Sequence, residues 1–280
     1  ILILVCTGTQ ANPYSINYNP FITFGDPISA ANGAFMFDLP LLHPGGPMDM
    51  KFVLSHYYDR YGDAGLLHNW RHNCAPDLLW LEDGGGGVQR MMCDLTNGHY
   101  AVFNKFGSEW VLDTSCPVRY VLKRVATEDT SGYYYLMDPV RDLVYMFETA
   151  ECPATDLCLL RLRYLIDRNG NTLTYTYDTT PGTDPMAPIL IEDGLGRSLT
   201  FVYTDWLLQS VTDQAGRTVT FTYDWNAPDY NNSLVLRSVT NAMGKTTTFT
   251  YQYFPEDVWM APVVAVEKPE GNTPYTQVPG

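Results

Sequence analysis

Two histidines, His68 and His72, stand four residues apart, which is the spacing of the zinc-binding pair in an H-E-x-x-H helix. Asn69 occupies the position of the glutamate that serves as general base in that motif. The surrounding residues are typical of a strand and a turn. We therefore interpret both histidines as polar side chains that pack a corner beside Trp70, and no metal site is predicted.

Cys74 follows His72 by two residues, but the sequence supplies no third group that would orient the histidine as the base of a nucleophilic pair. Four glycines at residues 84–87 lack the Lys-Ser/Thr and the helix start of a phosphate-binding loop, so they predict a hairpin tip. The sequence also lacks the motifs of α/β-hydrolases, dinucleotide-binding folds and EF-hand calcium loops.

Carboxylates are numerous, with 31 Asp and Glu, so a glycoside-hydrolase pair stays open as an alternative. Three of them, Asp167, Asp193 and Asp213, already have a structural explanation in the repeat described next. We predict no catalytic, cofactor-binding or metal-binding residue and no cofactor. The chain is expected not to be an enzyme.

The second half of the sequence repeats a turn pattern in which Asp or Asn is followed three residues later by Gly. An Asp or Asn side chain can accept a hydrogen bond from the backbone two residues on, and Gly can take the positive φ that a type I turn with a bulge requires. A fifth copy starts with Lys268. The predicted turn residues are Asp167, Gly170, Asp193, Gly196, Asp213, Gly216, Asn241, Gly244 and Gly271.

Each complete turn is followed by six residues in which apolar or aromatic side chains alternate with mostly Thr. This period of two predicts a strand with one buried face. The aromatic residues predicted for that face are Tyr175, Tyr177, Phe201, Tyr203, Phe221, Tyr223, Phe249 and Tyr251. An apolar residue also lies two positions before each turn, so every copy predicts a hairpin, and stacked hairpins form a continuous sheet.

These copies resemble the YD repeats of Rhs proteins and of related wall-associated and teneurin-type proteins. The Tyr-Asp pair is present at residues 177–178 and 223–224, whereas the fourth copy ends in Tyr251-Gln252. The resemblance covers about residues 160–277. It implies an all-β fold of stacked antiparallel β-hairpins in a YD-repeat solenoid or spiral shell. In bacterial relatives such a shell encloses a C-terminal toxin or another effector.

A second stretch, residues 24–80, resembles the module that precedes the repeats in bacterial Rhs proteins. It contains a G-D-P-I segment that ends in Gly33, a turn at residues 59–61 and a W-R-H-N box that starts at Trp70. His68 and Asn69 stand where a Gly commonly precedes the Trp. The resemblance implies an irregular β-rich module before the repeats. Further strands are predicted at residues 99–104, 109–112, 133–137 and 143–148.

The first residues form a short apolar run followed by small residues, which resembles the tail of a secretory signal peptide; an edge strand is the alternative. We therefore divide the chain into a signal remnant (1–11), an Rhs-type N-terminal β module (12–155) and an incomplete YD-repeat array (156–280). Cys152 and Cys158 could close a disulfide or stay as small buried thiols. No apolar stretch reaches the ~20 residues of a membrane span.

Seventeen Lys and Arg against 31 Asp and Glu give a net charge of −14, and no basic cluster exceeds a pair, so a nucleic-acid partner is not expected. The chain is predicted to be a non-catalytic structural part of a secreted or surface shell of bacterial origin. Its partners would be further repeats and a C-terminal effector or toxin domain absent from this chain. The alternative is a cell-surface adhesion or carbohydrate-binding module, in which Trp206 and Trp225 stack on surface glycans.

Overall fold

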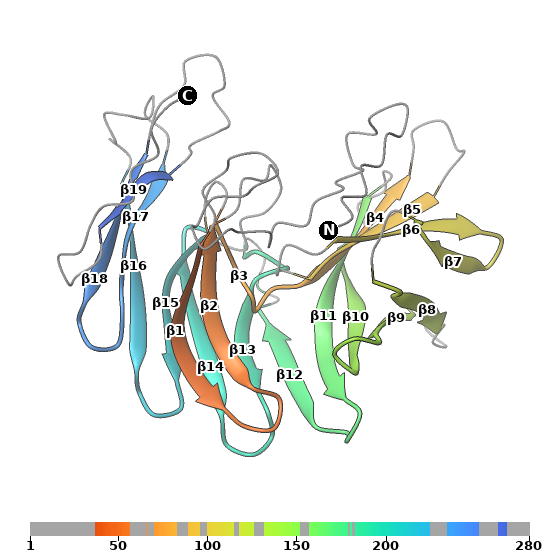
Figure 1. Ribbon diagram of the computed structural model, residues 1–280, viewed down its shortest axis with the longest axis horizontal. Coiled ribbons are helices and arrows are strands. Elements are labelled where there is room, and N and C mark those ends of the chain that lie inside the picture. Colours follow the sequence, from red (N-terminus) through yellow and green to blue (C-terminus); the bar gives the residue numbers. More distant parts are fainter. Residues whose placement is uncertain are drawn as a thin grey trace, which may run out of the picture.

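In the computed structural model the described residues are all-β, and nineteen strands form one 3-stranded and one 16-stranded antiparallel sheet (Figure 1). The prediction of an all-β antiparallel architecture is confirmed. The described residues are 37–56, 66, 70–82, 89–95, 100–114, 118–125, 132–151, 157–178, 180, 183–224, 234–251 and 263–267. Predictions that fall outside them concern residues 1–11, Gly33, residues 59–61, His68, Asn69, residues 84–87, Cys152, Trp225 and Gly271, and the side chain of Cys158 is also not described.

The repeat region is a meander in which each strand pairs with the next one in the chain. The predicted Asp/Asn–Gly turns close four successive hairpins, and Figure 1 shows these turns together at one end of the sheet. Its strands are β11 (Leu157–Asp167), β12 (Thr172–Tyr177), β13 (Pro188–Glu192), β14 (Ser198–Thr204), β15 (Leu207–Asp213), β16 (Thr218–Asp224), β17 (Val235–Thr240), β18 (Thr246–Tyr251) and β19 (Val263–Glu267).

The two faces of this meander differ in polarity, as the alternating sequence predicts. Tyr175, Phe201 and Phe221 on one face are only 3–4% exposed. Threonines on the other face pair across neighbouring strands, and the hydroxyl oxygens of Thr212 and Thr218 lie 3.0 Å apart. Such cross-strand pairs add to the backbone ladder, so one face contributes hydrophobic burial and the other contributes hydrogen bonds.

The strands before the repeats belong to the same large sheet. One edge of β11 pairs with β10. The other edge pairs with β4 in its first half and with β12 in its second half, so Arg161 lies opposite Glu148 on one side and Asp77 on the other. Strands on both sides of the predicted boundary at residue 155 therefore pair with each other. The additional strands are β4 (Asp77–Glu82), β5 (Gln89–Asp94), β6 (Tyr100–Phe106), β7 (Glu109–Leu112), β8 (Val121–Val125), β9 (Tyr133–Asp138) and β10 (Leu143–Glu151).

These strands follow the spatial order β7-β6-β5-β4-β11-β10-β9-β8, and Figure 1 shows both end strands on the same side of the molecule. Alternate side chains along the series are fully or almost fully buried. They include Met91, Phe103, Leu136, Phe147 and Leu160, each at most 1% exposed. The series thus builds a hydrophobic core that is continuous with that of the repeats.

The smaller sheet consists of β1 (Phe37–Gly45), β2 (Met50–His56) and β3 (Trp70–His72) and covers the aromatic face of the repeats. The ring of Phe52 lies 6.0 Å from those of Phe201 and Phe221, in edge-to-face geometry. The indole of Trp70 lies 4.3 Å from the ring of Phe249. This second layer explains why the aromatic face is buried, because an open sheet would leave it in water.

Candidate functional site

The predicted turn residues that the structure describes, all but Gly271, lie in the hairpin turns of the meander. The side chains of Asp167, Asp193, Asp213 and Asn241 each accept a hydrogen bond of 2.8–3.0 Å from the backbone nitrogen two residues on. The backbone of Gly216 has a φ of 78° and its nitrogen donates to the Asp213 carbonyl at 2.9 Å. Only a residue that tolerates positive φ can close this turn without strain.

Two of these carboxylates also form an ion pair with the residue four positions on. Asp193 Oδ2 lies 2.7 Å from Arg197 Nε, and Asp213 Oδ2 lies 2.6 Å from Arg217 Nε. Burial favours the neutral form of both carboxyl groups, but the backbone and arginine hydrogen bonds outweigh it, so the pKa of each is lowered. The negative charge of these turns is therefore compensated locally.

Four of the predicted strand tyrosines share a second contact, which sequence reasoning missed. The hydroxyls of Tyr177, Tyr203, Tyr223 and Tyr251 each donate to the backbone carbonyl that lies 15 residues earlier in the chain. The distance is 2.7 Å for Tyr177 and Tyr223 and 3.2 Å for Tyr203. The ring is thus anchored to the preceding strand at a fixed position in every copy.

The accepting carbonyl always precedes a β-bulge. The pairing register skips one residue at Arg163, Ile189, Gln209 and Arg237, and each follows directly after a carbonyl that a tyrosine binds. The bound carbonyl thus belongs to the residue directly before the extra residue of the bulge, and the tyrosine hydroxyl adds a side-chain hydrogen bond where the bulge interrupts the regular ladder. The side chains of Arg163 and Arg237 donate to backbone carbonyls of the following strand, at 2.8 Å and 3.2 Å.

A fixed structural unit therefore runs from each bulge to its tyrosine, over residues 163–177, 189–203, 209–223 and 237–251. All variation in repeat length falls in the connections at the opposite end of the sheet. The constant spacing between tyrosine and turn was visible in the sequence and could have indicated the unit. The bulge itself carries no recognisable residue type, since Arg, Ile and Gln all occupy it.

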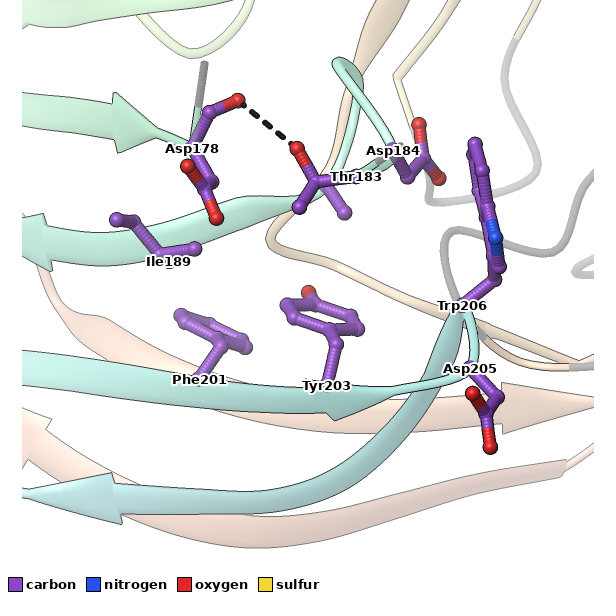
Figure 2. A pocket seen from close by; sticks show the side chains of 9 residues that line it. Asp178, Thr183, Asp184, Ile189, Phe201, Tyr203, Asp205 and Trp206 are labelled. Carbon is purple, nitrogen blue, oxygen red and sulfur yellow. Dashed lines mark hydrogen bonds between the residues drawn. The ribbon is translucent and has the colours of Figure 1, made fainter. Parts of the chain in front are cut away.

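A cavity of about 250 Å³ lies at that opposite end, between the β12–β13 connection and the β14–β15 turn. Figure 2 shows Phe201 and Tyr203 of β14 along one side of it and Asp178 and Trp206 at opposite ends. Thr183 lies across from Tyr203, and its hydroxyl lies 3.5 Å from the Asp178 carbonyl. Residues from two successive repeats thus enclose one hollow.

Trp206, predicted as a ligand-stacking residue, lines this cavity and is 57% exposed. It forms the two-residue β14–β15 turn with Asp205, and both have positive φ, 50° for Asp205 and 68° for Trp206. Turns of this kind favour Asn-Gly, because bulky residues are strained in the left-handed region. Backbone strain is concentrated at functional sites of proteins. The exposed tryptophan in this left-handed position therefore makes the turn a candidate functional site.

Three acidic residues, Asp178, Asp184 and Asp205, line the same cavity, and the described residues that line it include no Lys or Arg. Burial raises the pKa of Asp184, although the Met186 backbone nitrogen donates to its carboxylate at 2.8 Å and opposes the shift. Sequence reasoning did not single out Asp184, because only the folded connection brings it to the aromatic residues. The arrangement combines an exposed indole with negative charge.

A second cavity, of about 450 Å³, lies between the smaller sheet and the repeats and is lined in part by Cys74 and Tyr175. The Cys74 thiol lies 3.5 Å from the Lys51 carbonyl, and burial raises its pKa. The Nδ1 atom of His72 accepts a hydrogen bond from the Cys74 backbone nitrogen at 3.2 Å. The thiol is therefore held protonated, which is the opposite of an activated nucleophile.

Among the described residues, no three His, Cys, Asp or Glu side chains are grouped so that they could hold a metal ion. The described part of the chain also contains no helix that is long and apolar enough to cross a membrane. A scan against protein-family models and a search of curated proteins both find no match to this chain.

Proposed function

We propose that this chain is a non-catalytic structural part of a secreted or surface β-shell of the YD-repeat type. The observation that carries the proposal is the fixed unit from bulge to tyrosine, which recurs four times in consecutive hairpins. Each unit contains the hydrogen bonds that close its own turn and the tyrosine hydrogen bond next to its own bulge. Further copies can therefore extend the sheet at its edge by the same contacts. Such modular stacking is how repeat proteins extend.

Two further observations support a structural role. The repeat tyrosines and the arginine-paired turn carboxylates make hydrogen bonds within the fold, as expected of structural residues. The inert Cys74 thiol argues against nucleophilic catalysis at the cavity between the sheets. A shell would present its threonine face outward and its aromatic face toward the enclosed layer.

The proposal is tested on the complete reading frame from the source organism, expressed as one protein. A shell predicts further repeats, and a C-terminal domain that resists protease until the repeats unfold in denaturant. The same domain expressed alone serves as the control and should be cleaved readily. Equal cleavage rates for the enclosed and the isolated domain, or a frame without further repeats, would contradict the proposal.

A second candidate function is carbohydrate binding, and the exposed indole of Trp206 in its strained turn favours it. Aromatic rings exposed beside polar groups provide platforms for ligands with apolar faces. A glycan array on the purified chain tests this function. Signal that is lost in Trp206→Ala but kept in Leu195→Ala, a matched change at a residue 65% exposed at the other end of the hairpins, supports it. Uniform background binding contradicts it.

A further inference from the structure

The position two residues before each repeat tyrosine is phenylalanine in three of the four described copies and tyrosine in one. The three phenylalanines, Phe201, Phe221 and Phe249, pack against rings of the smaller sheet with centroid distances of 4.3–6.0 Å. Tyr175 is the exception, and it lines the cavity of about 450 Å³ between the sheets, called the inter-sheet cavity below. The copy that adds a hydroxyl at this position is thus the one whose ring faces the inter-sheet cavity.

The hydroxyl of Tyr175 differs from those of the four repeat tyrosines in its hydrogen bonding. Each repeat tyrosine donates to a backbone carbonyl. Tyr175 is only 4% exposed, yet its hydroxyl forms no hydrogen bond within the described part of the chain. Burial raises the pKa of Tyr175, so the group stays protonated and is available as a donor. Because a buried hydroxyl without a partner is costly, the donor requires an acceptor inside the cavity, from water or from a ligand.

The wall around this hydroxyl is mainly aliphatic. Aliphatic residues of four successive strands and of one preceding connection contribute to it, namely Leu95, Leu143, Leu165, Leu173, Ile191 and Leu199. A volume of about 450 Å³ lies within the ~300–1,000 Å³ of small-molecule sites and corresponds to about fifteen water molecules. The cavity therefore combines a large apolar surface with one buried donor, which is the usual composition of a small-molecule site.

The charged side chains on the described wall balance each other, with Lys51 and Arg141 against Asp38 and Asp49. Lys51 Nζ lies 2.9 Å from Asp49 Oδ2, and Arg141 Nη1 lies 3.6 Å from Asp138 Oδ2. Asp38 Oδ1 accepts a hydrogen bond of 2.6 Å from a serine hydroxyl. An ionised ligand would lose its hydration and gain only charges that already have partners, so the cavity favours an uncharged ligand.

We propose that the inter-sheet cavity binds an uncharged, mainly aliphatic small molecule that carries one carbonyl group, such as a medium-chain ketone or ester. The aliphatic part lies against the leucines of the wall, and the carbonyl oxygen accepts a hydrogen bond from the Tyr175 hydroxyl. The inference is independent of both proposed functions, because the shell rests on the repeat unit and carbohydrate binding rests on Trp206 at the other cavity.

The test measures how ligands displace the neutral fluorescent probe phenylnaphthylamine from the whole 280-residue protein. Methyl hexyl ketone and octane have similar chains, but only the ketone accepts a hydrogen bond. Each ligand is compared between the native protein and Tyr175→Phe, which introduces the residue of the other three copies. The affinity for the ketone should fall about three- to tenfold in the variant, as expected for a lost neutral hydrogen bond, and the affinity for octane should not fall.

A second pair of variants assigns the binding to this cavity. Leu165→Trp fills the cavity from a partly buried position on its wall and should weaken probe, ketone and octane about tenfold or more. Ile166→Trp is the matched control, because the next residue of the strand points to the other face and does not line the cavity. It should leave all three affinities unchanged. Thermal unfolding of each variant verifies that it is folded.

Four results would overturn the inference. If neither the probe nor the ketone binds, the cavity holds water only. If Leu165→Trp and Ile166→Trp bind the ketone equally well, the ligand lies elsewhere on the protein. If Tyr175→Phe leaves ketone binding unchanged, the hydroxyl does not contact the carbonyl. If octanoate at pH 7 binds more tightly than the ketone, the site selects a charged ligand.

Discussion

At the scale of single residues, the repeat tyrosines contribute a hydroxyl contact as well as a buried ring. The hydroxyl binds the carbonyl of the residue directly before the bulge, and this pairing recurs in all four described copies. A buried carbonyl without a partner is costly, so phenylalanine would not be an equivalent residue at this position. Packing alone would accept tyrosine or phenylalanine at this position, whereas the hydroxyl hydrogen bond requires tyrosine.

Tyr177→Phe should lower the free energy of unfolding by about 1–2 kcal/mol, because it leaves the Leu162 carbonyl without its 2.7 Å hydrogen bond. Tyr175→Phe is the matched control: Tyr175 is equally buried in the same strand but lines the larger cavity and does not make the repeat contact. Urea unfolding followed by circular dichroism measures both. If both variants lower the free energy of unfolding by the same amount, the hydrogen bond from the Tyr177 hydroxyl to the Leu162 carbonyl contributes nothing of its own.

The turn carboxylates predict a dependence of stability on pH. The pKa of Asp213 is lowered in the folded state from its ordinary value of 3.8. The stability that its ionised carboxylate contributes is therefore present above that value and is lost as pH falls through the folded pKa. Asp213→Asn should therefore destabilise the protein more at pH 7 than at pH 3, as thermal unfolding at both values would measure.

Asn241 provides the control for this pH dependence, because it makes the same turn contact with a side chain that does not titrate. Asn241→Ala should destabilise the protein by a similar amount at both pH values. A loss for Asp213→Asn that does not change between pH 7 and pH 3 would contradict the role assigned to the carboxylate charge.

At the scale of elements, the two ends of each hairpin obey different constraints. The β11–β12 and β15–β16 turns place glycine, Gly170 and Gly216, at the positions where the backbone has a positive φ. The β14–β15 turn does not, since Trp206 occupies a left-handed position with a φ of 68°. The sequence departs from favourable turn chemistry at the one described hairpin turn that lines the cavity of about 250 Å³.

Trp206→Gly should stabilise the protein by about 1 kcal/mol, because glycine adopts this conformation without strain and the indole is 57% exposed. Trp206→Ala keeps a Cβ in the left-handed region and should gain less. Thermal unfolding distinguishes the two variants, and both should lose the proposed saccharide binding. A marked loss of stability in Trp206→Gly would mean that the indole serves packing and not a ligand.

At the scale of the whole molecule, the smaller sheet closes the aromatic face of the repeats. Trp70 is fully buried at this contact and its Nε1 atom donates to the Tyr251 hydroxyl at 2.8 Å. That hydroxyl in turn donates to the Leu236 carbonyl, so the fourth repeat and β3 share one hydrogen-bond chain. The smaller sheet and the repeats are therefore joined by a buried chain of hydrogen bonds as well as by ring packing.

Trp70→Ala should cost roughly 3–5 kcal/mol, as expected for removing a fully buried large aromatic side chain between two layers. Trp70→Phe keeps a ring near Phe249 but loses the hydrogen bond and part of the buried volume, so it should cost less than Trp70→Ala. Urea unfolding of both variants tests the contact. A cost below about 1 kcal/mol for Trp70→Ala would show that the two sheets do not stabilise each other there.

Local patterns in the sequence predicted much of the fold. The turns at Asp167 and Asp213 and the alternating strands after them were predicted because hydrogen bonds within a few residues determine them. The strand predicted at residues 109–112 coincides with β7 (Glu109–Leu112), and the one at residues 133–137 lies within β9 (Tyr133–Asp138). Aromatic residues on one face predicted burial but not the element that would provide it.

The tertiary structure alone decided the remaining features. The pairing of β11 with both β4 and β10 joins segments distant in sequence, and no local pattern specifies such a partner. The cavity of about 250 Å³ likewise depends on the β12–β13 connection folding against the next hairpin, which brings Asp184 and Trp206 to the same cavity. By itself the sequence determined the repeating hairpins, because turn chemistry and side-chain alternation act over short range. Their partners and the pocket depend on packing between distant segments, which acts only once the chain is folded.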